Sequence, residues 1–224
     1  MRWPILDVLS DDERDGLLAS ARRRIFRRGD AVFHEGDPGD TLHLVQRGHV
    51  AVRRTLPTGD VGTLLVLCPG DVFGELAVVA PARRNATIVA VDGVETLAVS
   101  GAAFSDVRSR FPAIDRVLIQ ALATEVRRLS ALLMEALYVP AEARILVRLV
   151  ELARVFGGEA GQGPVVVPFT QEELAQMAGT ARPTVNRVLQ TAQDAGELQI
   201  RRGRIVVRDC GALRARADSV QDQA

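Results

Sequence analysis

The sequence contains no lysine, and its 28 arginines are balanced by 28 acidic residues. The formal net charge is therefore zero, which excludes bulk electrostatic attraction as the basis of binding to a polyanion. The two cysteines, Cys68 and Cys210, lie far apart and outside any CxxC pattern. This argues against an iron–sulfur cluster or a cysteine-based metal site, because isolated thiols are more typical of small buried residues.

Long hydrophobic runs are also absent. A helix that spans a bilayer needs roughly 18 consecutive apolar residues, and runs such as VGTLLVLC (61–68) are far shorter. The N-terminus becomes acidic at DDERD (11–15), unlike a secretory signal. We therefore expect a cytoplasmic protein without a membrane partner, and a chain of 224 residues has room for one or two domains with a buried core.

Short apolar runs dominate residues 25–99. TLHLV, HVAVRR, GTLLVL and ATIVAV are separated by turn sequences such as GDPGD and PGD. Many short strands at near-regular spacing predict an antiparallel barrel or jelly roll. Helices are expected on either side of the strands, over residues 4–24, where Ser10 supplies a start signal, and over residues 101–111.

A long helix is predicted over residues 113–137, which contain no glycine or proline. Its apolar residues recur every three or four positions: Ile114, Leu118, Leu122, Val126, Leu129, Leu133 and Ala136. A helix of this length with a narrow apolar stripe leaves hydrophobic surface exposed unless it has a partner. The stripe either packs on the strand domain of its own chain or pairs with a second copy of the helix, and we expect the second arrangement, a homodimer.

The pair Val139-Pro140 marks a hinge before a further amphipathic helix over residues 141–156. Two short helices separated by Gly179 follow. The first begins with a capping box formed by Thr170 and the glutamate three residues later, and Pro183 suits the first turn of the second. Two helices joined by a glycine-containing turn form a helix-turn-helix motif, whose second helix enters the major groove of DNA.

The outward face of that second helix carries side chains that read bases. Helical periodicity places Arg182, Thr184, Asn186 and Arg187 largely outward. Arginine bonds guanine O6 and N7 with two prongs, and asparagine bonds adenine in the same way. The sequence therefore predicts a DNA-binding surface here, the alternative being two core helices with solvated arginines.

A basic hairpin is predicted after this helix. LQIRRGRIVV (198–207) alternates around a glycine turn, and we expect Arg201, Arg202 and Arg204 to contact phosphate groups. Local basicity supports this expectation, because six arginines and one acid lie between Gln199 and Arg216.

The order of these elements and three motifs resemble the CRP/FNR family of bacterial transcription regulators over residues 5–210. The motifs are F-x-E-G-D-P-G-D-x-L-x-L-V-x-x-G-x-V (33–50), PGDVFGELAVV (69–79) and TQEELAQMAGTARPTVNRVL (170–189). The resemblance implies an α+β fold with an N-terminal antiparallel jelly-roll barrel of the cyclic-nucleotide-binding type. It divides the chain into an effector-sensing domain (1–112), a dimerisation helix (113–138) and a winged helix-turn-helix DNA-binding domain (139–224).

The family's catabolite-activator branch binds cyclic AMP inside the barrel, and the resemblance transfers this cassette to Gly74, Glu75, Leu76, Arg84 and Asn85. In that cassette the carboxylate accepts from the ribose and the arginine pairs with the cyclic phosphate; Arg83 is a neighbouring alternative to Arg84. Asn85 departs from the usual serine or threonine. The position that contacts adenine falls on apolar Leu129, with Ser130 beside it. The effector is therefore cyclic AMP, another nucleotide or small anion, or none, in which case Glu75 and Arg84 form a structural ion pair.

The resemblance also implies partners. The protein would bind a palindromic operator as a homodimer, with half-sites about one helical turn apart, and would contact RNA polymerase. Pro183 replaces the family's cytosine-reading glutamate, so the target should change at that base pair. We expect no required cofactor, no metal and no enzymatic activity. His34, His43 and His49 lack the spacing of a cupin metal site or a haem ligand set, although such an enzyme is the rival interpretation.

Overall fold

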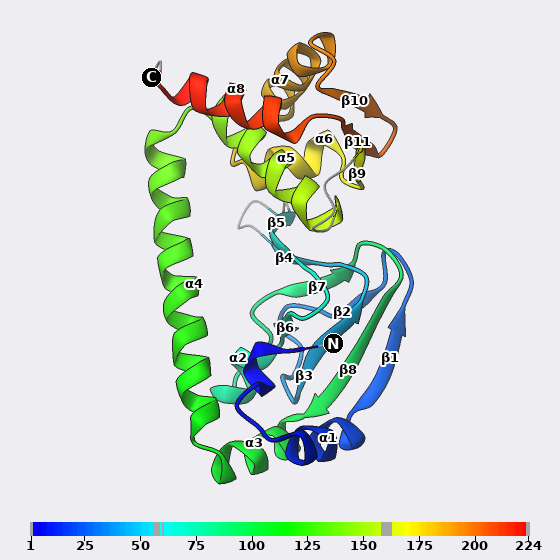
Figure 1. Cartoon of the computed structure of the whole chain (residues 1–224), viewed down its shortest axis with the longest axis vertical. Helices are drawn as coiled ribbons and strands as arrows, with labels where there is room; N and C mark the ends of the chain where they lie inside the picture. The colour runs from blue at the N-terminus through cyan, green and yellow to red at the C-terminus, as the bar shows by residue number, and fades with distance from the viewer. Residues whose placement is uncertain (1, 56–58, 60, 158–162, 223–224) are drawn as a thin grey trace. The chain divides into compact units, whose positions relative to one another are not determined.

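The computed structural model describes residues 2–55, 59, 61–157 and 163–222. The chain divides into two compact units, residues 1–127 and 128–224 (Figure 1). Each unit has its own buried hydrophobic residues. Helix α4 (Ala113–Tyr138) begins in the first unit and ends in the second. No helix within the described residues combines the length and the apolar character needed to cross a membrane.

Two antiparallel four-stranded sheets form the body of the first unit, in the orders β1-β8-β3-β6 and β2-β7-β4-β5. Phe26, Val45, Val50 and Ile88 come from different strands of the two sheets and meet in one buried cluster. This is the predicted jelly roll, built from two open sheets that face each other. The strands are β1 (Arg22–Phe26), β2 (Ala31–Phe33), β3 (Thr41–Arg47), β4 (Val50–Thr55), β5 (Val61–Leu67), β6 (Val72–Phe73), β7 (Thr87–Ala90) and β8 (Val94–Ser100).

Short helices of the first unit pack against its strands. They are η1 (Pro4–Leu6), α1 (Asp11–Ser20), α2 (Glu75–Val79) and α3 (Gly101–Arg110). The single helix expected over residues 4–24 is wrong at both ends, because residues 4–6 form a separate 3-10 helix and residues 22–24 belong to β1, although Ser10 caps α1 as predicted. The backbone of β1 pairs with β8 instead, with Arg22 opposite Ala98 and Phe26 opposite Val94. Tertiary strand pairing decides this segment, because RRRIF has no strong helical or strand pattern of its own.

The first turns of α4 pack in the core of the first unit. Ile114 and Leu118 are buried in a cluster with Trp3, Leu42 and Phe104. Farther along, the predicted stripe is exposed: Leu122, Val126, Leu129 and Leu133 all lie among the exposed large hydrophobic residues. The stripe therefore presents apolar surface on α4, and the pairing of this surface with a second copy of the helix stays a prediction.

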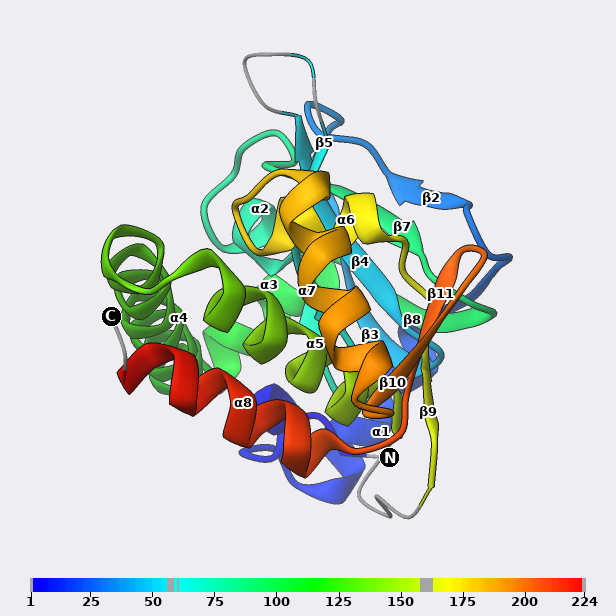
Figure 2. The ribbon, with the colours of Figure 1, turned by 90° about the horizontal axis from the view of Figure 1, so that it is seen from above.

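The second unit surrounds α5 with a small sheet and further helices. Its elements after α4 are α5 (Ala141–Gly157), β9 (Val165–Val167), α6 (Gln171–Met177), α7 (Arg182–Asp194), β10 (Leu198–Arg201), β11 (Arg204–Val207) and α8 (Cys210–Asp222). The sheet has the order β10-β11-β9 and is antiparallel. Figure 2 shows the hairpin of β10 and β11 beside β9.

Sequence reasoning missed α8. It lies along α5 (Figures 1 and 2) and buries Leu213 and Ala217. Arg216 of this helix forms an ion pair with Glu197, at 2.6 Å between Nη2 and Oε1. Arg216 therefore stabilises the second unit itself. The arginines of the β10–β11 hairpin are the ones available to an anionic ligand.

Candidate functional site

The turn between α6 and α7 has the geometry of a helix-turn-helix. Thr170 caps α6: its hydroxyl accepts from the Glu173 amide at 3.1 Å, and its own amide donates to the Glu173 carboxylate at 2.9 Å. Gly179 adopts φ = +59°, a conformation that favours glycine. The Thr180 amide then donates back to the Ala175 carbonyl at 3.0 Å. The predicted capping box and glycine turn are both confirmed.

Helix α7 separates an inward from an outward face. Val185, Val188 and Leu189 are buried, whereas Arg182, Pro183, Asn186 and Arg187 are exposed and Thr184 is half-buried. Pro183 lies in the first turn, where its missing amide hydrogen costs no helical hydrogen bond. The helix thus presents arginine and asparagine, the side chains suited to bonding purine edges, away from the core.

The hairpin beside α7 concentrates positive charge. Arg201 and Arg204 are directly opposite each other across β10 and β11, and Gly203 makes the turn with φ = +72°. Like charges placed opposite each other destabilise a strand pair. Gln199 accepts from Arg201 at 3.0 Å, but its amide oxygen is neutral and leaves the charge of the hairpin tip in place. An anionic ligand would relieve this repulsion.

Helix α7 and the hairpin line one groove of about 480 Å³. Its walls include Arg182 and Asn186 from α7, Thr170 and Glu172 from the start of α6, and residues 200–205 of the hairpin. The structure therefore brings together most of the residues that the sequence assigned to DNA. Pro183, Thr184 and Arg187 lie on α7 outside the lining of this groove.

In the first unit, Arg84 is drawn into the interior between the two sheets. It is 4% exposed and donates from Nη2 to the Thr41 carbonyl at 2.7 Å and to the Thr41 hydroxyl at 2.9 Å. Its Nη1 donates to the Gly74 carbonyl at 2.9 Å, and its guanidinium lies 4.1 Å from the centre of the Phe33 ring. Burial lowers its pKa, while the charges of Asp40 and Asp37 oppose this effect. The alternative of a structural ion pair with Glu75 is wrong, because Arg84 bonds the Gly74 and Thr41 oxygens instead.

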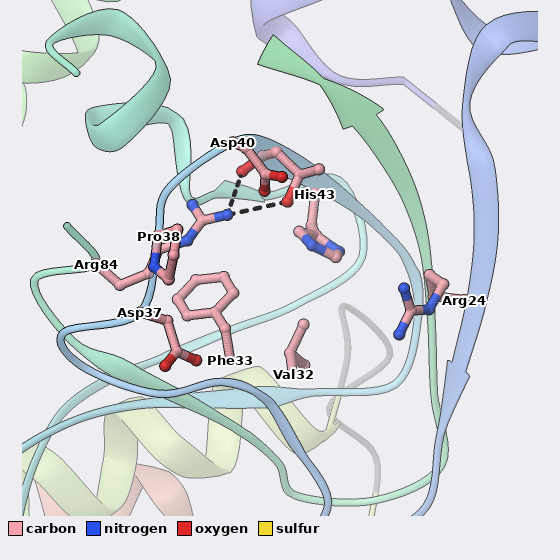
Figure 3. Close-up of a pocket in the computed structure, with 9 residues that line it drawn as sticks. Arg24, Val32, Phe33, Asp37, Pro38, Asp40, His43 and Arg84 are labelled. Carbon is pink, nitrogen blue, oxygen red and sulfur yellow. Dashed lines mark hydrogen bonds between the residues drawn. The ribbon is translucent and has the colours of Figure 1, made fainter. Parts of the chain in front are cut away.

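A cavity of about 310 Å³ opens beside Arg84 (Figure 3). It is lined by Arg24, Val32, Phe33, Asp37, Pro38, Asp40, Thr41, His43 and Arg84. His43 is 5% exposed, stacks on Phe73 at 5.0 Å between ring centroids and contacts the Thr96 hydroxyl at 3.1 Å. Burial and the nearby positive charges of Arg84 and Arg24 lower its pKa to about 4. His43 is therefore neutral near pH 7, and the two arginines supply the positive charge of the cavity.

Comparison with known proteins assigns the two parts of the chain that contain these sites to known domain families. Residues 23–111 match the family of cyclic nucleotide-binding domains, and residues 143–216 match the Crp-like helix-turn-helix domain. The chain is 32% identical over 193 residues to the CRP-like cAMP-activated global transcriptional regulator of Mycobacterium tuberculosis, with 86% of each protein covered. It is 32% identical over 210 residues to the cyclic AMP receptor protein of Thermus thermophilus, with 94% of each covered.

A solved structure agrees with these relatives. The crystal structure of the Thermus thermophilus catabolite activator protein matches 97% of this chain and 99% of that chain, at 32% identity and a TM-score of 0.55. The chain belongs to the CRP/FNR family of transcription regulators. Like other members, this regulator combines a cyclic nucleotide-binding domain with a DNA-binding helix-turn-helix domain, and the predicted family and fold are confirmed.

The remaining effector residues assigned from the sequence lie in both units. Glu75 is half-buried at the start of α2, and burial raises the pKa of its carboxyl. Arg83 is exposed and donates to the Gly36 carbonyl at 2.7 Å. Leu76 and Asn85 are exposed as well. Leu129 is 52% exposed on α4 and, with Ser130, belongs to the second unit. Their role in binding an effector stays a prediction.

Sequence reasoning missed the partners of Arg84. Phe33, Asp37, Asp40 and Thr41 lie within or next to the GDPGD motif, which helped to identify the family but was interpreted only as a turn. The signal was present, since two acids and an aromatic residue cluster there. Only the tertiary structure shows that this turn contacts the guanidinium of Arg84, a residue that follows the turn by more than 40 positions in the chain.

Proposed function

We propose that this regulator acts as a homodimer that binds a palindromic operator, and that a cyclic nucleotide, with cyclic AMP as the first candidate, changes its affinity for that operator. The observation that carries the proposal is the groove in which α7 and the β10–β11 hairpin present arginine and asparagine side chains together. No catalytic activity and no metal are part of the proposal. Residues 1–112, 113–138 and 139–224 would sense the effector, dimerise and bind DNA, respectively.

The DNA-binding part of the proposal divides the surface into two roles. Arg182, Asn186 and Arg187 read base edges in the major groove, with Pro183 and Thr184 beside them, because such side chains make two-pronged bonds to purines. Arg201, Arg202 and Arg204 contact phosphates and fix the position of α7 along the duplex. Thr170 orients the start of α6 toward the sugar-phosphate backbone of the DNA. In transcription, RNA polymerase would be the protein partner of the bound dimer.

The dimer would form through α4. Its exposed stripe contains Leu122, Val126, Leu129 and Leu133 at spacings of three and four residues. Two such stripes packed together remove apolar surface from water at about 25 cal/mol per Å², and two-stranded helix pairs use this spacing. A dimer also places two α7 helices on the two half-sites of a palindrome.

The effector part of the proposal rests on the cassette around Arg84. A guanidinium enclosed between Phe33 and the Thr41 and Gly74 carbonyls is a phosphate-binding group whose position is already defined. Glu75 would accept from a ribose hydroxyl, and Gly74, Leu76, Arg83 and Asn85 would line the same region. Two relatives at 32% identity are named for cyclic AMP, which supports this choice of nucleotide.

A second candidate is a DNA-binding dimer that needs no effector or responds to a different one. Two observations favour it. The donors Nη1 and Nη2 of Arg84 already have protein acceptors, and apolar Leu129 stands where the resemblance places an adenine contact. A cyclic nucleotide therefore has to compete with Thr41 and Gly74 for Arg84.

Fluorescence anisotropy on a duplex chosen by in vitro selection tests the proposal, with and without cyclic AMP. For DNA binding, Arg182→Ala is compared with Arg214→Ala, a matched control whose arginine pairs with Asp218 on α8. We expect Arg182→Ala to weaken binding by about 5- to 150-fold, corresponding to roughly 1–3 kcal/mol for a two-pronged base contact. Arg214→Ala should stay within about twofold of the wild type, as expected for an exposed ion pair.

Each outcome decides a separate part of the proposal. Equal losses in the two variants would refute the assignment of the groove to DNA. An operator affinity that cyclic AMP leaves unchanged would refute the effector assignment and favour the second candidate. A monomer in sedimentation analysis at the concentrations used for DNA binding would refute the dimer.

A further inference from the structure

The junction between α4 and α5 contains an arginine whose bonds reach two other helices. Arg144 lies in the first turn of α5, and its side chain donates to four backbone carbonyls. Nη1 donates to the Val139 carbonyl at 2.7 Å and to the Ala136 carbonyl at 3.3 Å. Nε donates to the Ala178 carbonyl and Nη2 to the Gly179 carbonyl, each at 3.0 Å.

These acceptors belong to two helix C-termini. Ala136 lies in the last turn of α4 and Val139 directly follows this helix, whereas Ala178 is the C-cap of α6 and Gly179 lies in the turn before α7. Carbonyls at helix C-termini lack partners within the helix and carry partial negative charge, so a cation is favourable there. One guanidinium therefore holds the last turn of α4 against the turn of the helix-turn-helix motif.

A second arginine strengthens the α4 side of this connection. Arg148, one turn farther along α5, forms ion pairs with Glu135 of α4 and with Glu151. The Arg148 and Glu135 side chains are only 15% and 22% exposed, so solvent screens this pair less than a surface pair. The end of α4 is thus bonded to α5 by both arginines, and Arg144 continues the connection to the turn before α7.

We infer that Arg144 is a positioning residue that couples the end of α4 to the DNA-reading helix. Arg182, the first residue of α7, is three positions after Gly179, so a shift of the turn moves the base-contacting side chains directly. The α4 helix is the proposed dimer element, and a change in its last turn reaches α7 through this guanidinium. The inference builds on the proposed function but names the residue that transmits the change.

The planar five-donor guanidinium is required for this role. Lysine keeps the positive charge near both helix C-termini, but its ammonium is a compact group with three donors and cannot hold four carbonyls on two elements. Arg144→Lys therefore separates coupling from stability. If Arg144 only stabilises the fold, lysine should restore much of its effect; if Arg144 couples the two elements, lysine should not.

The first measurement is the ratio of operator affinities with and without cyclic AMP, for wild type, Arg144→Lys, Arg144→Gln and the matched control Arg154→Gln, an exposed arginine elsewhere on α5. Allosteric ratios are typically about 5- to 150-fold. We expect the ratio to fall to within about twofold of unity in both Arg144 variants and to stay at the wild-type value in Arg154→Gln. Thermal unfolding and sedimentation confirm that each variant is folded and dimeric. A wild-type ratio in folded Arg144→Lys would overturn the inference.

A second measurement tests the inference without cyclic AMP. It therefore remains decisive even if cyclic AMP does not change the operator affinity of the wild type, a result that would refute the effector assignment alone. Tyr138→Gly loosens the last turn of α4, and a double-mutant cycle combines it with Arg144→Lys, with operator affinity as the readout. We expect Tyr138→Gly to change DNA affinity by about fivefold or more when Arg144 is present, and by less than about twofold in the Arg144→Lys background. Additive effects of the two substitutions, or no effect of either one, would show that α4 and α7 are not coupled through Arg144.

Discussion

Replacing Thr41 by valine tests whether Arg84 has to leave its present partners when an effector binds. The Thr41 hydroxyl accepts from Arg84 Nη2 at 2.9 Å. Valine has nearly the same shape as threonine, suits the first residue of strand β3, and leaves the Thr41 backbone carbonyl in place. The substitution therefore removes one bond that competes with a nucleotide phosphate for Arg84.

The size of the effect follows from that bond. A hydrogen bond between a charged and a neutral group contributes about 1.5–3 kcal/mol, and we take the lower value because the Thr41 carbonyl still accepts from the same nitrogen. If effector binding breaks this bond, the wild type loses its free energy on binding, whereas Thr41→Val has no such bond to lose. The variant should therefore bind the effector more tightly by about 1.5 kcal/mol, or roughly tenfold. The free protein should lose a similar amount of unfolding free energy.

Calorimetric titration with cyclic AMP measures this affinity. The matched control is Thr96→Val, which removes a buried hydroxyl that contacts His43 rather than Arg84. We expect tighter binding in Thr41→Val only. An affinity that is lower, or within about twofold of the wild type, would refute the reasoning, because Arg84 would then meet the phosphate without giving up Thr41.

Three further predictions concern stability. Thr170→Ala removes the cap of α6 and should lower the unfolding free energy by about 0.5–2 kcal/mol in urea titration, whereas a loss below this range would mean that the capping box is not formed in solution. Thr63→Val should raise the unfolding free energy by about 1 kcal/mol, because the Thr63 hydroxyl is buried with no hydrogen-bond partner in the described structure; a decrease would show that the hydroxyl does have a partner. Because the pKa of His43 is lowered to about 4 from an ordinary value of 6.5, the unfolded chain binds a proton between these pH values that the folded chain does not. The stability contributed by neutral His43 is therefore complete above pH 6.5 and is lost as the pH falls toward 4. Between about pH 7 and pH 5, the unfolding free energy of the wild type should fall by about 2 kcal/mol more than that of His43→Gln. Equal decreases in the two proteins would contradict this account.

Local pattern was enough to predict most of the elements. The three- and four-residue spacing of the α4 stripe, the Thr170 capping box and the glycine turn at Gly179 depend on neighbours in the chain, and the structure contains all three. Strand β1 could not be predicted in this way. Its pairing with β8 joins residues about 70 positions apart, and this pairing overrides the weak local preference of RRRIF.

The two candidate sites differ in the same respect. The DNA-binding surface lies on consecutive residues of one helix and one hairpin, so periodicity alone could place Arg182, Asn186 and Arg201 outward. The surroundings of Arg84 could not be inferred, because Thr41 and Phe33 reach it across the two sheets. The Arg84–Glu75 ion pair considered from the sequence was wrong for this reason.

Residue spacing along the chain is sufficient to specify most of the elements of this regulator, the helix face that carries the basic side chains, and the apolar stripe of α4. Helices and strands repeat every 3.6 and 2 residues, so neighbours in the chain settle these properties. The hydrogen bonds of Arg84 and Arg144 depend instead on the folded arrangement. A guanidinium bonds whichever oxygens the fold brings within reach, and that proximity is set by the packing of elements that are distant in the chain.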